Sequence, residues 1–200
     1  MLELIRRRRF ALLGVSSVSL LATVGANGFL LATATADRSV KGCTIVDNPT
    51  PEHHTACSGH NLSGADLSYT DLYRADLSTA DLSGAKLTGS DLSRAKLSQA
   101  NLSRAQASHA SLFRANLSGA DLSHAHLPYA NLARAGLSHV SLTYATFTDA
   151  SVYLADLSHA NLSHAIAYNV LLSYARLCNT TLPNGKVSDI TCHYPPFGGS

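Results

Sequence analysis

The chain has 200 residues, of which 46% are hydrophobic and 14% are charged. Its 15 lysine and arginine residues nearly balance its 13 aspartate and glutamate residues, so the formal net charge is only +2. This balance is less basic than that of proteins that seek nucleic acid, and less acidic than that of proteins that imitate it. We therefore expect no nucleic-acid partner.

The first 36 residues have the layout of an export signal. Arg6 to Arg9 form a basic start, residues 10–31 are largely apolar, and Ala34-Thr35-Ala36 offers a small-residue cleavage site. This order is typical of a secretory signal peptide, which we expect to be helical and to be removed. Arg7-Arg8-Arg9-Phe10 resembles the twin-arginine export pattern. A membrane anchor through residues 10–31 is the alternative, because this run is long enough to span a bilayer.

Cleavage after Ala36 would change the charge balance of the chain. It would remove Arg6 to Arg9 and Glu3, which leaves 11 basic and 12 acidic residues and a net charge of −1. The exported protein is therefore expected to be close to neutral, apart from its ten histidines.

Residues 37–59 are expected to form an N-terminal cap with two possible chemistries. Cys43 and Cys57 lie close in sequence to His53, His54 and His60, and thiolate and imidazole groups suit zinc or copper. The spacing is not a standard zinc pattern, and an oxidising destination with an even number of cysteines favours disulfides. We therefore expect a disulfide and no metal, with a metal-binding extracellular protein as the alternative.

A five-residue repeat occupies residues 60–184. Between Leu62 and Leu182 there are 25 positions at this spacing, and 21 of them are leucine; alanine lies two residues before in 19 units, and serine or threonine follows in 17. A period of five fits neither an amphipathic helix nor a flat strand. Residues two apart on an extended segment point the same way, so alanine and leucine can both face inward if the other residues turn the chain. Four right-angled turns would close a coil of four units, with coils stacked about 4.8 Å apart.

The residue before each central leucine completes the pattern. It is aspartate in seven units and asparagine in five: Asp66, Asp71, Asp76, Asp81, Asp91, Asp121 and Asp156, and Asn61, Asn101, Asn116, Asn131 and Asn161. The chain thereby resembles the pentapeptide-repeat family. The resemblance implies an all-β fold, a right-handed quadrilateral β-helix, here with about six coils. Some cytosolic members of this family resemble DNA in shape and charge and protect topoisomerase from quinolone drugs, so a topoisomerase-interacting DNA mimic is an alternative function.

Residues 185–200 are expected to form a C-terminal cap and tail. Cys178 and Cys192 lie near the end of the repeats, and we expect all four cysteines to lie outside the coils proper. Pairings between the two ends of a rod are too long for a disulfide, which needs Cα atoms within about 7 Å. The sequence therefore predicts Cys43–Cys57 and Cys178–Cys192, which would staple the two ends of the rod.

Four arginines recur at every fourth repeat unit and form the candidate anion-binding site: Arg74, Arg94, Arg114 and Arg134. In coils of four units they would stack on one side of the molecule. Asp71 and Asp91 are expected to neutralise the first two, whereas Ser111 and Asn131 hold the equivalent positions further on. Arginine suits phosphate and carboxylate recognition. The alternative is a solvated face on which arginine stems cover apolar surface.

No catalytic residues or cofactor are expected. A catalytic site needs a nucleophile, an oriented base and a pocket, and a core of leucine and alanine leaves no cavity. His139 and His159 would occupy equivalent positions in adjacent coils, and so would His124, Tyr144 and His164. A tetrahedral metal site needs more ligands than either set provides. We therefore expect a secreted, non-enzymatic scaffold with a structural role or a binding role, its partner being a protein or an anionic polymer.

Overall fold

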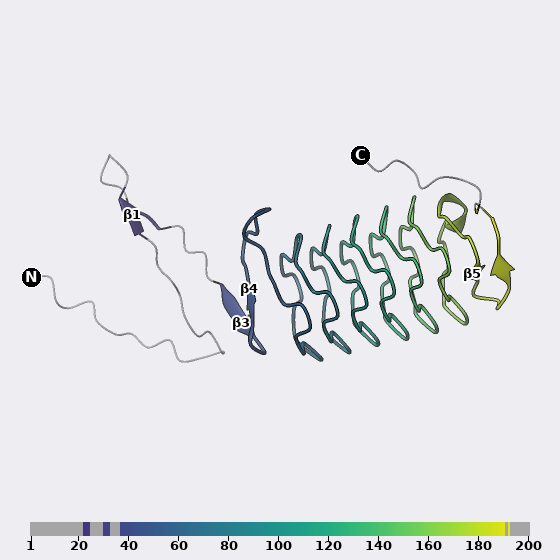
Figure 1. The fold of residues 1–200 in the computed structure, drawn as a ribbon, viewed down its shortest axis with the longest axis horizontal. Coiled ribbons are helices and arrows are strands. Elements are labelled where there is room, and N and C mark those ends of the chain that lie inside the picture. The colour runs from purple at the N-terminus through teal and green to yellow at the C-terminus, as the bar shows by residue number, and fades with distance from the viewer. Residues whose placement is uncertain (1–21, 25–29, 33–36, 191, 193–200) are drawn as a thin grey trace, which may run out of the picture.

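The computed structural model describes residues 22–24, 30–32, 37–190 and 192. Most of the described chain winds into a stack of similar coils that lie between strand β4 (Cys43–Ile45) and strand β5 (Thr180–Thr181), as Figure 1 shows. The repeat residues make single bridges rather than long strands. The coils hold most of the candidate functional residues, so their register determines which side chains share a face.

Successive coils pair in parallel with a constant offset of four repeat units. The bridges run from Ala56↔Asp76 to Asn161↔Thr181. Asp81 pairs with Asn101, and the Leu82 N–H donates to the Asn101 carbonyl at 2.7 Å. Leu82 and Leu102 therefore lie in neighbouring coils, which the five-residue repeat predicts. A lane is defined below as the set of residues that lie four units apart in successive coils.

The core is a continuous column of alanine and leucine. Leu82, Leu102 and Phe147 are at most 2% exposed, and the alanines two residues before the central positions are buried with them. Polar residues in the alanine position are satisfied by backbone: Ser90 donates to the Leu87 carbonyl at 2.8 Å and Thr180 donates to the Leu157 carbonyl at 2.6 Å. Aliphatic burial of this kind is the main stabilising term of the fold.

Two local devices turn the chain in each unit. In all twelve units with aspartate or asparagine before the centre, this side chain accepts a hydrogen bond from the N–H two residues on, for example Ser123 to Asp121 at 2.8 Å. Such bonds stabilise turns. The corner residue, two after the centre, has a positive φ at every fifth position from residue 59 to residue 169. Most corners are not glycine, and the sequence repeat did not predict this strained backbone.

Two short strands lie in the segment that was expected to be a helical signal. β1 (Ala22–Val24) pairs antiparallel with β2 (Leu30–Ala32). The expectation of a helix is therefore wrong for these six residues. Thr23 and Val24 are β-branched, and glycines at positions 25 and 28 lower helix propensity in the sequence between the strands. The rest of residues 1–36, including the basic start and the cleavage site, lies outside the described residues.

The N-terminal cap is a hairpin that covers the first coil. β3 (Arg38–Val40) pairs antiparallel with β4, and Lys41 and Gly42 in the turn between them have positive φ. Ile45 is fully buried and extends the core. Arg38 donates a hydrogen bond to the Thr70 hydroxyl, which ties this hairpin to the coils.

The predicted Cys43–Cys57 disulfide is present, with Cα atoms 5.6 Å apart. Its position corrects one expectation, because Cys57 lies inside the coils. Its N–H donates to the Asp76 carbonyl at 2.7 Å and its side chain is fully buried, as the central leucines are. The parallel ladder accordingly begins at Ala56, before the expected start at residue 60.

The C-terminal end departs from the regular coil. The bridge that the register would place between residues 151 and 171 is missing, and Leu172–Tyr174 form the short 3-10 helix η1. Beyond it, β5 pairs antiparallel with β6 (Val187–Ser188), and the predicted Cys178–Cys192 disulfide has Cα atoms 4.5 Å apart. Cys178 also belongs to the ladder, since its carbonyl accepts the His159 N–H at 2.8 Å.

Within the described part of the chain, no helix is both long and apolar enough to cross a bilayer. Most of the proposed anchor, residues 10–31, lies outside the described residues, apart from β1 and the first two residues of β2.

Candidate functional site

The four candidate arginines form one lane on the surface of the coils. Each occupies a corner, with φ of 58° or 59° at Arg74, Arg94, Arg114 and Arg134. The N–H of each donates to the following coil, for example Arg94 to the Phe113 carbonyl at 2.9 Å and Arg134 to the Tyr153 carbonyl at 2.8 Å. The ladder therefore fixes the backbone of this arginine lane, and the side chains leave it at the outermost point of each turn.

The guanidinium groups of the arginine lane lack acidic partners. No ion pair or side-chain hydrogen bond involves them within the described residues. Arg74 lies over the ring of Tyr73 at 5.6 Å, and Arg114 lies over the ring of Phe113 at 5.3 Å. Such cation–π contacts attract the guanidinium group to the ring but leave its charge in place. This lane can therefore attract an anion from solvent.

The expected neutralisation of the first two arginines is not found. The Asp71 carboxylate accepts the Tyr73 N–H at 2.9 Å and the Asp91 carboxylate accepts the Ser93 N–H at 2.8 Å. Each carboxylate is engaged in its own turn, and neither comes within ion-pair distance of an arginine in the described chain. The local turn therefore decides where these carboxylates point.

Acidic residues pair instead with basic residues of their own lane. Lys86 pairs with Asp66 at 3.7 Å, Lys96 with Asp76 at 3.8 Å, and Arg176 with Asp156 at 3.5 Å. These pairs join adjacent coils and are at least partly exposed, so each contributes little to stability. Lys96, which lies two residues after Arg94 in the sequence, is therefore offset by Asp76.

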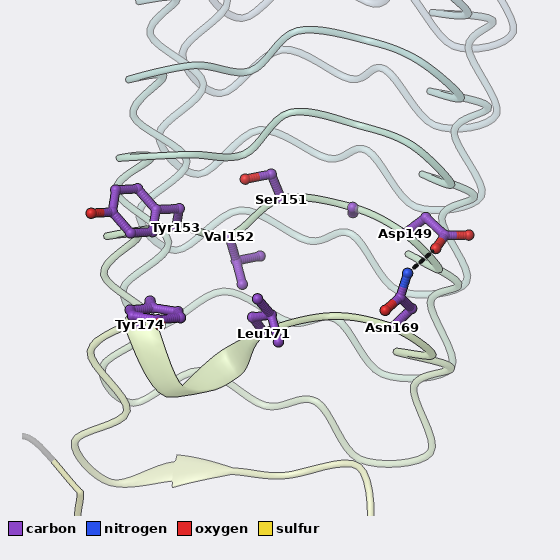
Figure 2. A pocket seen from close by; sticks show the side chains of 8 residues that line it. Asp149, Ser151, Val152, Tyr153, Asn169, Leu171 and Tyr174 are labelled. Atoms are coloured by element: carbon purple, nitrogen blue, oxygen red, sulfur yellow. Dashed lines mark hydrogen bonds between the residues drawn. The ribbon is translucent and has the colours of Figure 1, made fainter.

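A hollow lies at the C-terminal end of the face that carries the arginine lane, where the bridge between residues 151 and 171 is missing (Figure 2). Its volume is about 240 Å³, and it is lined by Asp149, Ala150, Ser151, Val152, Tyr153, Asn169, Leu171 and Tyr174. The Asn169 amide donates to the Asp149 carboxylate at 2.5 Å, and the rings of Tyr153 and Tyr174 are tilted by 52° with centroids 5.6 Å apart. The repeat predicted a filled core and did not indicate this hollow, because it arises from a missing bridge.

Histidine and tyrosine side chains stack along three other corner lanes. His139 stacks on His159 with centroids 4.7 Å apart, and Tyr144 lies between His124 and His164 at 5.1 Å and 4.8 Å. His109 and Tyr129 make a third stack. The sequence placed the members of the first two lanes together correctly. Nearly parallel rings at this distance form a favourable apolar contact.

The described residues contain no group of three or more histidine, cysteine, aspartate or glutamate side chains that could hold a metal ion. The histidines and cysteines of the N-terminal cap fall within this statement. Cys43 and Cys57 are joined as a disulfide, so their thiolates are not available as ligands.

Three carboxyl groups near the N-terminal end have lowered pKa values: Asp66, Asp76 and Asp81. For Asp66 and Asp81 the largest cause is a hydrogen bond from a serine side chain, and the N–H of the same serine lowers the pKa further. For Asp76 burial raises the pKa, but hydrogen bonds from Ser78 and the charge of Lys96 together outweigh it. These carboxylates are held ionised by turn chemistry, as structural groups are.

The exposed side chains of the coils are better suited to binding a ligand than to catalysing a reaction. The serines beside the corners take part in turns, as Ser118 does when it donates to the Asn116 side chain at 2.8 Å. A catalytic site requires a nucleophile with an oriented base beside a pocket. The features that stand out are an unpaired arginine lane and an apolar hollow on one face.

A family comparison agrees with this architecture. The model of the family described as pentapeptide repeats, in eight copies, matches residues 53–84, 80–119, 115–152 and 155–188. These matches cover more than half of the chain, so the protein belongs to the pentapeptide-repeat family. The right-handed β-helix follows from this membership. Proteins of this family are generally non-enzymatic scaffold or interaction proteins.

Solved structures of the family are also similar in sequence. HetL from Nostoc, a protein involved in heterocyst differentiation regulation, is 31% identical over 66% of this chain and 78% of its own, with a TM-score of 0.29. A thylakoid-lumen pentapeptide repeat protein from Arabidopsis thaliana is 29% identical over 55% of this chain and 63% of its own, with a TM-score of 0.38. QnrB1, a plasmid-mediated fluoroquinolone resistance protein, is 16% identical over 64% and 79%, with a TM-score of 0.49. No curated protein matches the chain.

Proposed function

We propose that the protein is a secreted, non-enzymatic scaffold that binds an anionic polymer along the arginine lane. The observation that carries this proposal is that four arginines follow one another in adjacent coils without an acidic partner in the described chain. Like charges about 5 Å apart in water repel by less than about 1 kcal/mol, so the lane is stable when empty. A linear anion would contact several guanidinium groups at once, and the gain from each contact would add.

The arginine lane can be removed without disturbing the core. Replacing Arg94, Arg114 and Arg134 together with glutamine keeps side chains of similar length and removes three charges. We expect the mature protein to be retained on a heparin column and the triple variant to elute at clearly lower salt. Elution at the same salt concentration would contradict the proposal.

Arg104 provides a matched control. It is an exposed corner residue with a φ of 59°, and it lies in another lane, between Gly84 and His124 of the neighbouring coils. Arg104→Gln removes one charge of the same kind from a different place. Its effect on elution should be much smaller than one third of the effect of the triple variant.

Export by a twin-arginine-like signal and cleavage after Ala36 are part of the proposal. N-terminal sequencing of the extracellular protein should give Asp37 as the first residue. Retention of residues 10–31 in a membrane fraction would favour the anchored form instead.

A quadrilateral cross-section with about six coils is also proposed. Its support is that each coil contains four units, and that every corner from residue 59 to residue 169 has a positive φ. A crystal structure of the mature protein would test both the shape and the number of coils.

A topoisomerase-interacting DNA mimic is the competing function. It would need an acidic surface, whereas the central coils present the unpaired arginine lane. A supercoiling assay with the mature protein, with and without a quinolone, would distinguish the two functions. Inhibition or drug protection would favour the mimic.

A further inference from the structure

Aromatic rings recur at every second coil beside the arginine lane. The residue before each arginine corner is Tyr73, Ser93, Phe113 or Ala133, and Tyr153 and Ser173 continue this lane. The rings of Tyr73, Phe113 and Tyr153 are therefore two coils apart, which corresponds to about 10 Å at the ordinary strand spacing. In the coils between them, the same position is held by the small residues Ser93 and Ala133.

The arginines alternate with the same period. Arg74 and Arg114 lie over the rings next to them. Arg94 and Arg134 follow Ser93 and Ala133, and they make no ring contact, ion pair or side-chain hydrogen bond within the described residues. In each coil that lies between two rings, the arginine therefore has no partner among the described residues.

The hollow at the end of this face has an apolar wall and unsatisfied backbone groups. Val152 is only 3% exposed, yet its N–H has no hydrogen-bond partner among the described residues, and the Ala150 carbonyl accepts no bond from Leu171. A buried N–H without a partner costs free energy unless a ligand or water satisfies it. Tyr153, Leu171 and Tyr174 line the space beside these groups (Figure 2).

We propose that this face binds an acidic polysaccharide that carries carboxylate or sulfate groups, and that one sugar ring enters the hollow. This inference rests on the proposed function and names the class of polymer. A sugar ring has an apolar face of C–H groups, which packs on aromatic rings, and hydroxyl groups that both donate and accept hydrogen bonds. It can therefore cover Tyr153 while one hydroxyl accepts from Val152 N–H and donates to the Ala150 carbonyl.

The spacing of aromatic rings and arginines on this face matches a polymer in which sugar rings alternate with anionic groups. A ring-to-ring distance of about 10 Å is comparable with the length of a disaccharide. Anionic groups on the sugars between Phe113 and Tyr153 would meet Arg134, and guanidinium groups bind carboxylate or sulfate in a bidentate manner. A flat nucleic-acid base suits the hollow less well, because the two tyrosine rings are tilted by 52° and leave no parallel slot.

Binding of polygalacturonate, inorganic polyphosphate and single-stranded DNA to the mature protein tests the proposal. We expect polygalacturonate to bind best when charge concentrations are equal. The double variant Phe113→Leu and Tyr153→Leu should weaken polygalacturonate binding by about tenfold, because it removes two ring contacts. Its effect on polyphosphate should stay within about twofold, since polyphosphate meets only the arginines.

Tyr129→Leu is the matched control, since Tyr129 is an exposed tyrosine of another lane, and it should leave polygalacturonate binding unchanged. Equal binding of polyphosphate and polygalacturonate, insensitive to the ring variants but sensitive to Arg94→Gln with Arg134→Gln, would overturn this inference and leave the proposed function intact. Tighter binding of DNA would also overturn it. Failure of all three polymers to bind would contradict both proposals.

Discussion

Residues 56–166 and residues 167–184 are built from similar five-residue units, but only the first region is a regular ladder. In the first region every corner has a positive φ, whether it is glycine, arginine, histidine or tyrosine. In the second region Tyr174 leaves this conformation and joins η1. Asn169 and Asn179 keep a positive φ there, because asparagine tolerates this conformation well.

This difference shows what holds the strained corners. A bulky residue in the left-handed region costs of order 1 kcal/mol and persists only where its surroundings over-determine it. Tyr129 and Tyr144 have ladder bonds from their N–H groups to the next coil. Tyr174 has no such bond among the described residues, and it relaxes. The hollow beside Tyr153 is a result of this relaxation.

The largest expected difference between the two regions concerns the core. Leu112 is 1% exposed with a coil on each side, whereas Leu172 is only partly buried at the broken end. Leu112→Ala should destabilise the protein by about 3 kcal/mol, and Leu172→Ala by about 1 kcal/mol. Denaturant unfolding of both variants measures the difference. Equal losses would show that the end is packed as well as the middle.

Removal of each disulfide should destabilise the two ends of the coil stack by different amounts. Each closes a loop with a sequence separation of 14, for which chain entropy alone gives about 3 kcal/mol. Replacing both Cys43 and Cys57 with serine should lower the free energy of unfolding by more than this value, because it also places a hydroxyl in the core position of Cys57. The paired change of Cys178 and Cys192 should cost less. Thermal unfolding of the two variants in the absence of reductant tests this order.

The turn carboxylates should make the ladder sensitive to acid. The pKa of Asp81 is lowered in the folded protein, so its stabilising effect is complete above its unfolded pKa of about 3.9 and is lost as the pH falls through the lower folded value. Asp81→Ala should cost about 1 kcal/mol at neutral pH, since the turn bond from the Ser83 N–H and the bond from the Asn101 amide are both lost. Asp81→Asn keeps an acceptor, as Asn61 and Asn101 do, and should remove this part of the acid sensitivity. Denaturant unfolding of both variants at neutral and acidic pH measures these effects.

The smallest expected effect concerns a corner of the regular region. Thr79 is β-branched and has a φ of 57°, a conformation that such residues rarely adopt. Thr79→Asn should stabilise the protein by about 0.5 kcal/mol, because asparagine tolerates this conformation and offsets the loss of the threonine hydroxyl bond to Ser78. Unfolding midpoints would detect the gain, and an unchanged or lower midpoint would show that the ladder already removes the strain.

Much of the fold follows from the spacing of alanine and leucine. Residues such as Leu82 and Leu102 reach the core of adjacent coils because a period of five, with two inward residues per unit, has few other solutions. The stacking of Arg74, Arg94, Arg114 and Arg134 follows from the same arithmetic. The disulfides were predictable because only neighbouring cysteines could meet.

The sequence was less informative where turn hydrogen bonds or packing at the ends of the ladder determine the position of a side chain. Asp71 could not be recognised as a turn acceptor from its charge alone, and it was expected to pair with Arg74. Cys57 was placed outside the coils because cysteine does not resemble leucine in the repeat, although both fill the same core position. The hollow at Val152 was not predictable, since it depends on how Leu171 and Tyr174 pack at the end of the ladder.

The constant offset of four repeat units between coils has a consequence for how such a chain can change length. Duplication of a single unit would shift every later side chain by one position around the axis, so that part of the arginine lane would pass to a different face. Duplication of four units would preserve all lanes and would add one member to each. Growth of this protein by whole coils therefore lengthens an existing surface, whereas growth by single units creates new combinations of neighbours.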